Sequence, residues 1–275
     1  MEGVLKTMAL AYSLGDWVLL FYIYCFIGWC FETTFVSVFC KHHFVNRGFL
    51  FGPVLPIYGF GALTILVSTF PFRAHWWLVG LAGMAAATLL EYVTGVVMEA
   101  LFKVRYWDYS HKRFNFQGHI CLTSSLAWGV MSVLLVYYLN QPVEKLIGMI
   151  DPQIRQIIVF VITVIFTVDL THAVTTAIDL KKLLARVDTM REEVRKLQKR
   201  IENLETAAKE AKDQRLAQLT DELNALRDKQ RMMGDMLAER FDTAKRSLLR
   251  RNPTALSKKY KEALDKIHEW QARRS

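Results

Sequence analysis

The sequence contains few cysteines, and their spacing does not indicate a metal site or a disulfide framework. Of the 275 residues, four are cysteines (Cys25, Cys30, Cys40 and Cys121), and none has the paired spacing of a zinc site. No GxxxxGK[ST] loop is present, so the chain has no phosphate-binding motif of that type for ATP. The first apolar run continues to about Phe39, which is too long for a signal peptide, and we expect it to remain as a helix.

Charged residues are scarce in the first two thirds of the chain and abundant in the last third. Up to Ile178 there are ten Lys and Arg against nine Asp and Glu, whereas from Asp179 onward there are 25 against 17. This contrast indicates a membrane domain joined to a solvated helical domain. We therefore expect a transmembrane domain at 1–178, a cytoplasmic coiled coil at 179–251 and a basic amphipathic helix at 252–275, with no nucleic-acid partner.

Five apolar segments are long enough to cross a bilayer, whose core of about 30 Å requires roughly 20 helical residues. They cover about 14–39, 49–70, 76–102, 120–139 and 155–178. An odd number of spans with the basic tail inside places the N-terminus outside and the C-terminal coil in the cytoplasm. The sequence thus predicts an all-α, polytopic cell-membrane protein with about five transmembrane helices, followed by a long cytoplasmic coiled-coil helix.

The second apolar segment is irregular, with four glycines and two prolines between Gly48 and Gly61. Proline removes a backbone donor and glycine permits unusual dihedral angles, so freed backbone groups in lipid need partners from protein or from cavity water. Two interpretations stay open: a broken or re-entrant segment that lines a site, or a helix that starts late, near Pro56. The cavity-lining candidates are Gly52, Pro53, Pro56, Tyr58 and Gly59, with Trp107 and Asn115 from an aromatic, charged loop at 103–119.

Apart from Asp16 and Arg155, which stand at the outer ends of the first and fifth expected spans, four acids and no Lys or Arg lie inside the spans, namely Glu32, Glu91, Glu99 and Asp169. Ionisable residues at membrane depth are costly and mark candidate functional sites. In the expected orientation all four lie in the inner half of the membrane, where they could converge on one polar cavity. The candidates for binding a substrate or an ion are Glu32, Arg47, Glu91, Glu99, Asp108, Asp169 and His172.

Each of these acids also has a structural interpretation. Glu99 and Asp169 are near enough to a helix end to be solvated or to pair with a basic neighbour. Glu32 and Glu91 are deeper, and each could pair with Arg47 or with indole and tyrosine donors. Glu91 and Glu99 also continue a stripe of small residues, Gly83, Ala87 and Gly95, that recurs at every fourth position, and we expect that face of the helix to pack against protein.

Five short motifs carry a resemblance to a known family: Gly48-Phe-Leu-Phe-Gly-Pro-Val-Leu-Pro-Ile-Tyr-Gly59, Leu90-Glu91-Tyr-Val-Thr-Gly, Met98-Glu99, Trp107-Asp108-Tyr-Ser110 and Gly118-His-Ile-Cys-Leu122. Together they resemble the bacterial putative ABC-transporter type IV, or CmpB-like, membrane proteins over about residues 20 to 140. The resemblance implies a permease role. Because the chain has no phosphate loop, ATP hydrolysis in such a system belongs to a separate ATPase subunit.

The tail carries heptad repeats. β-Branched residues occupy one repeated position and mostly leucine the other, a pattern that favours a parallel two-stranded coiled coil. We expect a homodimer held by Val187, Val194, Leu197, Ile201 and Leu204, while an antiparallel hairpin within one chain, turning near Ala211–Leu216, stays open. The basic C-terminal helix is expected to bind anionic lipid or to pack against the coil.

Three functions are compatible with these patterns. The first is a dimeric transport or channel-like protein in which Glu32 and Glu91 form a cation- or proton-responsive site. The second is an intramembrane enzyme acting on a lipid-type substrate, with Asp108, His119, Asp169 and His172 as acid–base or metal candidates. The third is a membrane-anchored coiled-coil scaffold. The sequence indicates no particular cofactor or metal and leaves catalytic activity open.

Overall fold

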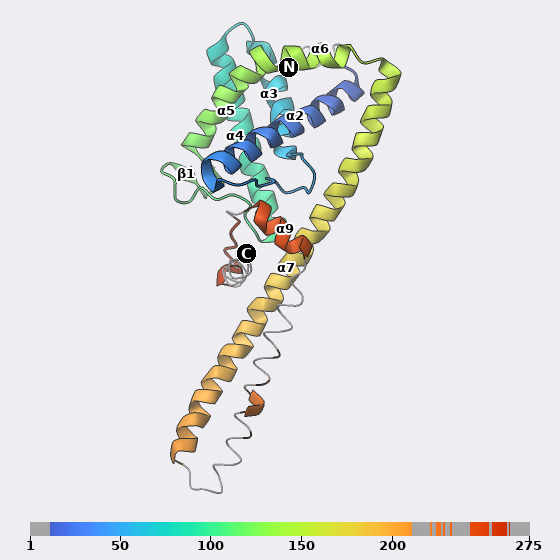
Figure 1. The fold of residues 1–275 in the computed structure, drawn as a ribbon. Helices are drawn as coiled ribbons and strands as arrows, with labels where there is room; N and C mark the ends of the chain where they lie inside the picture. The colour runs from blue at the N-terminus through green and yellow to red at the C-terminus, as the bar shows by residue number, and fades with distance from the viewer. Residues whose placement is uncertain are drawn as a thin grey trace. The chain divides into compact units, whose positions relative to one another are not determined.

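The computed structural model describes residues 12–210, 221, 224–226, 228, 232, 243–252, 255–262 and 264, and within them the chain is mostly helical (Figure 1). The helices are α2 (Leu14–Phe35), α3 (Pro56–Thr69), α4 (Trp76–Phe102), α5 (Leu122–Leu134), α6 (Asn140–Gly148), α7 (Pro152–Glu210) and α9 (Thr243–Arg251). Two π-helical turns, η1 (Val36–Lys41) and η3 (Leu135–Leu139), follow α2 and α5, and a 3-10 turn, η2 (Phe70–Phe72), follows α3. Strand β1 (Asn115–Phe116) pairs antiparallel with β2 (Ile120–Cys121). The helical class expected from the sequence is confirmed.

The chain divides into two compact units. The first comprises Met1–Thr175 together with Leu248–Leu256, and the second comprises Thr176–Ser247 and Ser257–Ser275. The expected division into 1–178, 179–251 and 252–275 stays a prediction. The first unit also includes a segment from near the C-terminus, which the sequence did not indicate.

Four helical segments are long and apolar enough to cross a membrane: Leu14–Phe39, Trp76–Phe102, Leu122–Gly148 and Pro152–Met190. The remaining apolar segment, Pro56–Phe72, is shorter because the residues before Pro56 are not helical. A helix start at Pro56 is one of the two interpretations given above, and proline is well tolerated in a first turn, where its missing N–H has no partner. The chain is thus a helical membrane protein, while the number of crossings and the orientation stay predictions.

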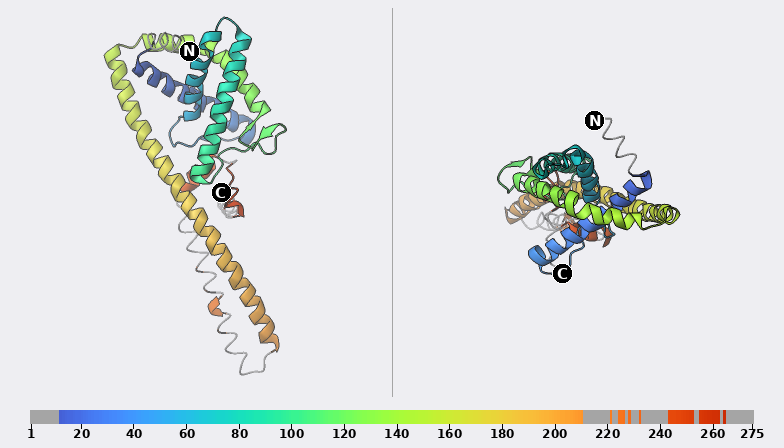
Figure 2. Two further views of the ribbon diagram at one scale, coloured as in Figure 1. Left: turned by 180° about the vertical axis from the view of Figure 1, so that it is seen from behind. Right: turned by 90° about the horizontal axis from the view of Figure 1, so that it is seen from above.

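Helices α4 and α5 lie side by side, and small residues permit their close approach (Figure 2). Gly83, Ala87, Glu91 and Gly95 are all buried, which confirms that this stripe of α4 faces protein. A methyl group on Gly83 would lie 2.2 Å from the hydroxyl oxygen of Ser132 on α5. Any larger side chain at this position would therefore push the two helices apart.

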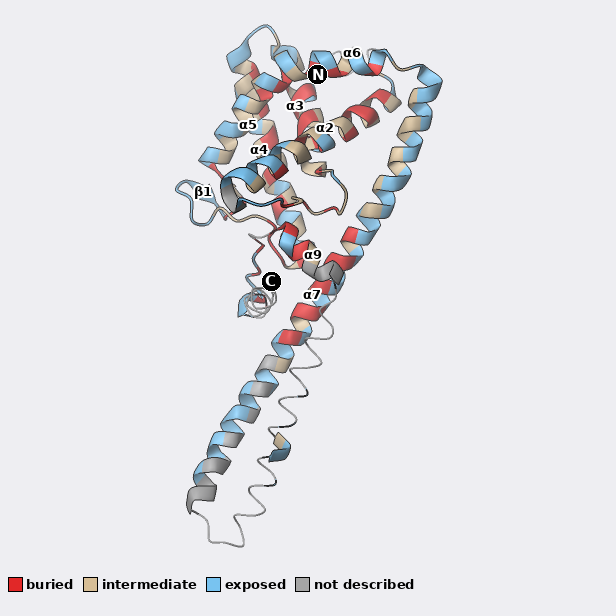
Figure 3. Cartoon of the chain, in the orientation of Figure 1, coloured by how far each residue is buried: buried red, intermediate tan, exposed pale blue. Residues whose placement is uncertain are grey.

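The surface of the first unit is largely apolar. In the most apolar stretch of α7 only 6% of the residues are buried, and Figure 3 shows this part of the helix as a mixture of exposed and intermediate residues. Phe160 and Val168 are 69% and 66% exposed, respectively. Apolar surface of this extent is expected where a helix contacts lipid, because lipid removes the penalty of exposing it to water.

The second unit is built on α7 from Thr176 onward. Leu180, Leu183 and Val187 occupy the first heptad positions and are at most 5% exposed within a single chain. The side chains of the other dimerisation candidates, Val194, Leu197, Ile201 and Leu204, lie outside the described part of the structure. The coiled coil and the dimer therefore stay predictions.

Candidate functional site

The residues between η1 and α3, here called the 42–55 segment, run back along α2 without forming a helix. Three backbone hydrogen bonds mark its course: Val45 donates to Ser37 Oγ (2.9 Å), Arg47 to Thr33 Oγ1 (3.3 Å) and Leu55 to the carbonyl of Cys25 (3.0 Å). From Ser37 to Cys25 these partners span about 18 Å of helix at 1.5 Å per residue. Non-helical backbone thus lies alongside a membrane-spanning helix.

Asp169 of α7 satisfies backbone groups of this segment. Its carboxylate accepts hydrogen bonds from the N–H groups of Phe51 (2.9 Å) and Gly52 (2.7 Å). A methyl group on Gly52 would lie 3.0 Å from Asp169 Oδ2, so glycine permits this close approach. Asn46 Nδ2 in turn donates to the carbonyl of Phe51 (2.9 Å). Backbone at membrane depth requires such partners, and Asp169 supplies two of them.

Glu91 of α4 is buried, with 5% of its surface exposed, and it is bound by neutral donors. Tyr109 donates its hydroxyl to Oε1 (3.2 Å), and the indole Nε1 of Trp128 donates to Oε2 (3.1 Å). Burial, together with the nearby charge of Glu91, raises the pKa of Tyr109 far above its usual value, so this hydroxyl remains a donor. The expected pairing of Glu91 with indole and tyrosine donors is confirmed. Within the described part of the chain no basic side chain pairs with it.

Glu32 of α2 differs from Glu91 in having no hydrogen-bond donor among the residues that the structure describes. Its nearest basic partner is Arg47, whose Nε lies 3.9 Å from Oε2, at the outer limit of an ion pair. The Glu32 side chain is 30% exposed, against 14% for Arg47. The expected pairing with Arg47 is present, yet most of the hydrogen-bonding capacity of this carboxylate is unused.

Tyr58, near the start of α3, lies between the two acids. Its ring packs on Gly28 of α2, where a methyl group would lie 2.2 Å from Tyr58 Cγ, and its centroid is 5.6 Å from that of Trp128. Tyr58 interacts electrostatically with both Glu32 and Glu91. Residues Glu32, Arg47, Tyr58, Glu91, Tyr109 and Trp128 therefore form one polar group, which we call the Glu32–Glu91 site.

The Glu32–Glu91 site carries more negative than positive charge. It contains two carboxylates and one guanidinium, that of Arg47, in the part of the chain that the structure describes. Neutral donors such as Tyr109 and Trp128 stabilise a carboxylate but do not cancel its charge. Because unbalanced charge is costly at membrane depth, the site has capacity for one additional positive charge.

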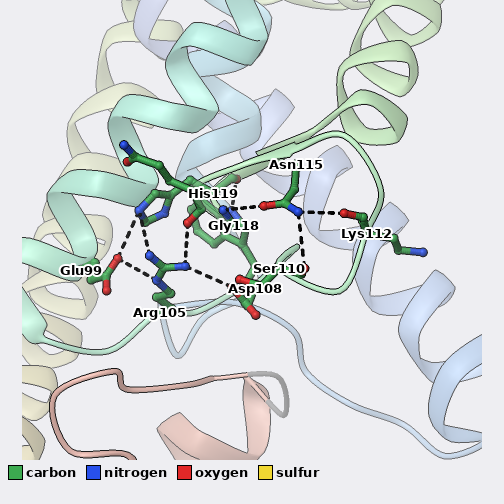
Figure 4. Close-up of polar contacts among 10 residues, drawn as sticks. Glu99, Arg105, Asp108, Ser110, Lys112, Asn115, Gly118 and His119 are labelled. Carbon is green, nitrogen blue, oxygen red and sulfur yellow. Dashed lines mark hydrogen bonds and ion pairs between the residues drawn. The ribbon is translucent and has the colours of Figure 1, made fainter.

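A second group of polar side chains surrounds Arg105, in the loop between α4 and β1 (Figure 4). Arg105 is 4% exposed. Its Nε donates to Glu99 Oε2 (2.7 Å), and its Nη1 donates to Asp108 Oδ1 (3.1 Å). His119 Nε2 lies 3.1 Å from the same Glu99 oxygen. The charges of Glu99 and Asp108 are thus engaged by a buried arginine, which the sequence analysis did not identify.

The loop around Arg105 is also held by two residues that were expected to line a cavity. Asn115 Oδ1 accepts from the N–H of Gly118 (3.1 Å), and its Nδ2 donates to the carbonyl of Lys112 (2.8 Å). Trp107 Nε1 donates to the carbonyl of His119 (3.0 Å). These bonds fix the turn of the loop, so Trp107 and Asn115 bind backbone groups of the loop itself.

The remaining candidates lie on or beside the 42–55 segment. The ring of His172 on α7 lies 4.4 Å from that of Phe51, measured between centroids. Gly59 of α3 faces Cys25, whose Sγ would lie 2.5 Å from an added methyl group. Pro53 belongs to the segment and Pro56 opens α3.

The structure thus assigns the site candidates to three groups. They are the Glu32–Glu91 site with Glu32, Arg47, Tyr58 and Glu91; the Arg105 loop with Glu99, Trp107, Asp108 and Asn115; and the 42–55 segment with Gly52, Asp169 and His172. No group of three or more His, Cys, Asp or Glu side chains among the described residues is placed to hold a metal ion.

Sequence reasoning did not single out Tyr109, Trp128 or Arg105. Tyr109 stands inside the Trp107–Ser110 motif, so that motif was a usable signal. Trp128 lies in an apolar helix, where an indole is indistinguishable from a packing residue until its donor is seen to meet a carboxylate. The buried position of Arg105 arises from long-range loop packing, which no local pattern indicates.

Comparison with protein families gives a match over residues 19–174 to a family described as "Putative ABC-transporter type IV". The matched range contains every residue of the Glu32–Glu91 site, as well as Asp169. Comparison with curated proteins and with solved structures gives no significant match.

Proposed function

Because the chain belongs to the family described as "Putative ABC-transporter type IV", we propose that it is a permease whose Glu32–Glu91 site binds one monovalent cation or one proton. In the expected orientation, with the N-terminus outside, the two acids lie in the inner half of the membrane and the site opens toward the cytoplasm. The charge would then be taken up from, or released to, that side.

The observation that carries this proposal is the difference between the two carboxylates. Glu91 is buried and its oxygens already accept from Tyr109 and Trp128. Glu32 is partly exposed, has no hydrogen-bond donor among the described residues, and has a cation only at 3.9 Å. A carboxylate with unused acceptor capacity beside a second, uncompensated carboxylate is suited to bind a proton or a small cation. Glu32 is therefore the proposed contact residue, and Glu91 supplies the second negative charge.

The 42–55 segment supports a transport role. Transporters commonly place substrate sites where helices are interrupted, because interrupted backbone exposes polar groups at membrane depth. Here the interruption precedes α3, and Arg47 within it reaches Glu32. Movement of this segment would alter the charge balance at Glu32 directly. Gly52, Pro53 and Pro56 keep the segment non-helical.

Assembly with other molecules is part of the proposal. The chain contains no phosphate loop, so a separate ATPase subunit would supply any ATP hydrolysis. The basic C-terminus would contact anionic lipid. A parallel coiled-coil dimer and a hairpin within one chain remain the two arrangements of the tail.

The proposal is tested by the thermal stability of the purified protein in detergent, measured with Li⁺, Na⁺, K⁺ and NH₄⁺ at constant ionic strength and across a pH series. A cation that binds the folded state raises its stability by about 2.7 kcal/mol at a concentration 100 times the Kd. We expect one cation, or protons, to raise the melting temperature of the wild type but not of Glu32→Gln.

The matched control is Glu202→Gln, which removes the same charge from an exposed position on α7. It should respond to cations as the wild type does. An equal response of all three proteins would show that the cations act elsewhere, and the proposed site would be wrong. Cation uptake into proteoliposomes should follow the same pattern, with Glu32→Gln reduced and the control unchanged.

The alternative of an intramembrane enzyme receives no support from the geometry. Its four candidate residues divide between the Arg105 loop, which holds Asp108 and His119, and α7, which holds Asp169 and His172. Activity in cells distinguishes the scaffold alternative from the permease. A scaffold predicts that Glu32→Gln leaves this activity intact, while removal of the tail abolishes it.

A further inference from the structure

The end of α9 and the described residues after it, here called residues 248–256 for Leu248–Asn252, Ala255 and Leu256, belong to the first unit, and Arg251 and Asn252 contact the 42–55 segment. Arg251 Nη1 donates to the carbonyl of Leu50, and its guanidinium lies 3.9 Å from the centroid of the Phe51 ring. Asn252 Nδ2 donates to the carbonyl of Gly48 (3.0 Å). These carbonyls belong to non-helical backbone, so residues from near the C-terminus supply hydrogen-bond donors that the segment cannot obtain from a helix of its own.

A second contact fixes the far end of the docked residues. Leu256 and Arg105 exchange both backbone hydrogen bonds as an antiparallel bridge, with N–O distances of 2.6 and 2.9 Å. Leu248 and Leu249 are at most 1% exposed. The attachment is therefore built from backbone pairing and side-chain hydrogen bonds together, which is more than an incidental surface contact provides.

Arg251 is a buried cation that keeps its charge. Burial lowers its pKa to about 10, which is still far above neutral pH, and the carboxylate of Asp169 interacts favourably with it. Asp169 also holds the N–H groups of Phe51 and Gly52. The backbone at residues 50–52 is therefore bound from two sides. Asp169 of α7 accepts from its N–H groups, and Arg251 donates to the carbonyl of Leu50.

Arg47 connects the docked residues to the proposed cation site. Its Nη1 donates to the carbonyl of Arg251 (3.3 Å), while its Nε lies 3.9 Å from Glu32. Docking thus helps to hold the guanidinium beside Glu32, where it offsets part of the negative charge of the site and limits access to the carboxylate. Loss of docking would free Arg47 and leave the carbonyls of Gly48 and Leu50 without these donors.

We propose that residues 248–256 form an internal latch whose docking on the 42–55 segment and on Arg105 keeps Arg47 beside Glu32, and whose release makes the partly exposed Glu32 more accessible. The residues on either side of the latch belong to the second unit, so an event at the tail can act on the membrane site through it. The effect of latch release on cation binding rests on the proposed function. The docking of the latch and its effect on the exposure of Glu32 are independent of the proposed function.

The first test is hydrogen–deuterium exchange of the full chain in detergent, comparing Arg251→Ala with Arg250→Ala. Arg250 is the matched control, because it is the preceding arginine of the same helix and its side chain is exposed. We expect the amides of residues 47–55 to exchange about tenfold faster or more in Arg251→Ala, since a charge-assisted hydrogen bond is lost and a buried carbonyl is left without this donor. The control should match the wild type. Unchanged exchange in Arg251→Ala would overturn the latch.

Asn252→Ala is a second, milder variant, and it keeps the test informative if Arg251→Ala fails to fold. It removes the donor to Gly48 but leaves Arg251 in place, so a smaller increase at 47–55 is expected. Exchange of the α4–α5 amides serves as the measure of intact folding and should stay unchanged in all variants. A uniform increase over both regions in Arg251→Ala and Asn252→Ala would mean that these changes unfold the first unit instead of releasing a latch, and would also overturn the proposal.

The second test measures the exposure of Glu32 without any cation. In Glu32→Cys, the rate of labelling by a cationic methanethiosulfonate reagent is compared with and without Arg251→Ala, and the labelling of the native cysteines in the protein that retains Glu32 is subtracted. We expect labelling at position 32 to be about tenfold faster when the latch is released. Faster exchange at 47–55 with unchanged labelling would overturn the gating of Glu32. A positive result stands even if no cation stabilises the protein, so failure of the latch and failure of the proposed function can be distinguished.

Discussion

Replacing Asp169 by asparagine tests whether this acid supports the non-helical backbone. The carboxylate accepts from two N–H groups, at 2.9 and 2.7 Å, whereas an amide of the same shape has only one oxygen and presents an NH₂ group to the second donor. Hydrogen bonds to charged groups contribute roughly 1.5–3 kcal/mol each and neutral ones about 0.5–1.5 kcal/mol. Asp169→Asn exchanges two hydrogen bonds to a charged group for one neutral hydrogen bond. At a partly exposed position, this exchange should lower the free energy of unfolding by about 2–4 kcal/mol.

The assay is thermal unfolding in detergent, followed by circular dichroism. For a unit of this size, 1 kcal/mol corresponds to about 2–4 °C, so Asp169→Asn should melt about 4–16 °C lower than the wild type. The control is Asp179→Asn on the same helix, where the carboxylate is 55% exposed and pairs with Lys182 at 3.2 Å. A surface pair of this kind contributes under about 1 kcal/mol. If the two variants melt at the same temperature, Asp169 does not support the segment and the reasoning is refuted.

Two further predictions concern helix packing and assembly. Gly83→Ala should destabilise the protein by about 1–3 kcal/mol, because its methyl group would lie 2.2 Å from Ser132 Oγ, whereas Gly80→Ala, with its nearest neighbour at 3.4 Å, should be neutral in the same unfolding assay. Equal stability of these two variants would contradict the close packing of α4 on α5. Light scattering in mild detergent should give the mass of one chain, 31.8 kDa, if the tail pairs within the chain, and twice that mass would instead support the parallel dimer.

Those parts of the fold that follow from local periodicity could be predicted from the sequence. Apolar length alone located the long helices, and the four-residue repeat of Gly83, Ala87, Glu91 and Gly95 identified the buried face of α4. Part of the site followed from the same reasoning. An acid inside an apolar helix needs partners, and the nearest basic residue to Glu32 in the folded chain is the one expected, Arg47.

The role of Asp169 could not be predicted, because its partners are backbone N–H groups more than a hundred positions earlier in the chain. Sequence reasoning treats an intramembrane acid as a possible ligand group or as one half of an ion pair. It does not anticipate that the acid replaces missing helical hydrogen bonds in another segment. The same limit applies to Arg105, because Glu99, Asp108 and the carbonyl of Gln117 come together around it only when its loop folds over the end of α4.

The docking of residues 248–256 was also beyond prediction, since the sequence there reads as the end of a charged helix. Arg251 looks like any of its basic neighbours, and only the structure distinguishes it from the exposed Arg250. Its burial is intelligible once the interrupted backbone of the 42–55 segment is known. A carbonyl that has lost its helical partner is a strong acceptor in an apolar environment, and a guanidinium that also contacts an aromatic ring is a fitting donor.

The family match includes the proposed cation site but not the latch residues Arg251 and Asn252. Glu32, Arg47, Glu91 and Asp169 all fall within residues 19–174, so the proposed cation site and its backbone support lie in the part of the chain that defines the family. The donors from Arg251 and Asn252 lie outside that range. Cation binding and its control by the tail should therefore be separable. Arg251→Ala should change how readily Glu32 is reached while leaving the charge selectivity of the site, which depends on its carboxylates, as it is in the wild type.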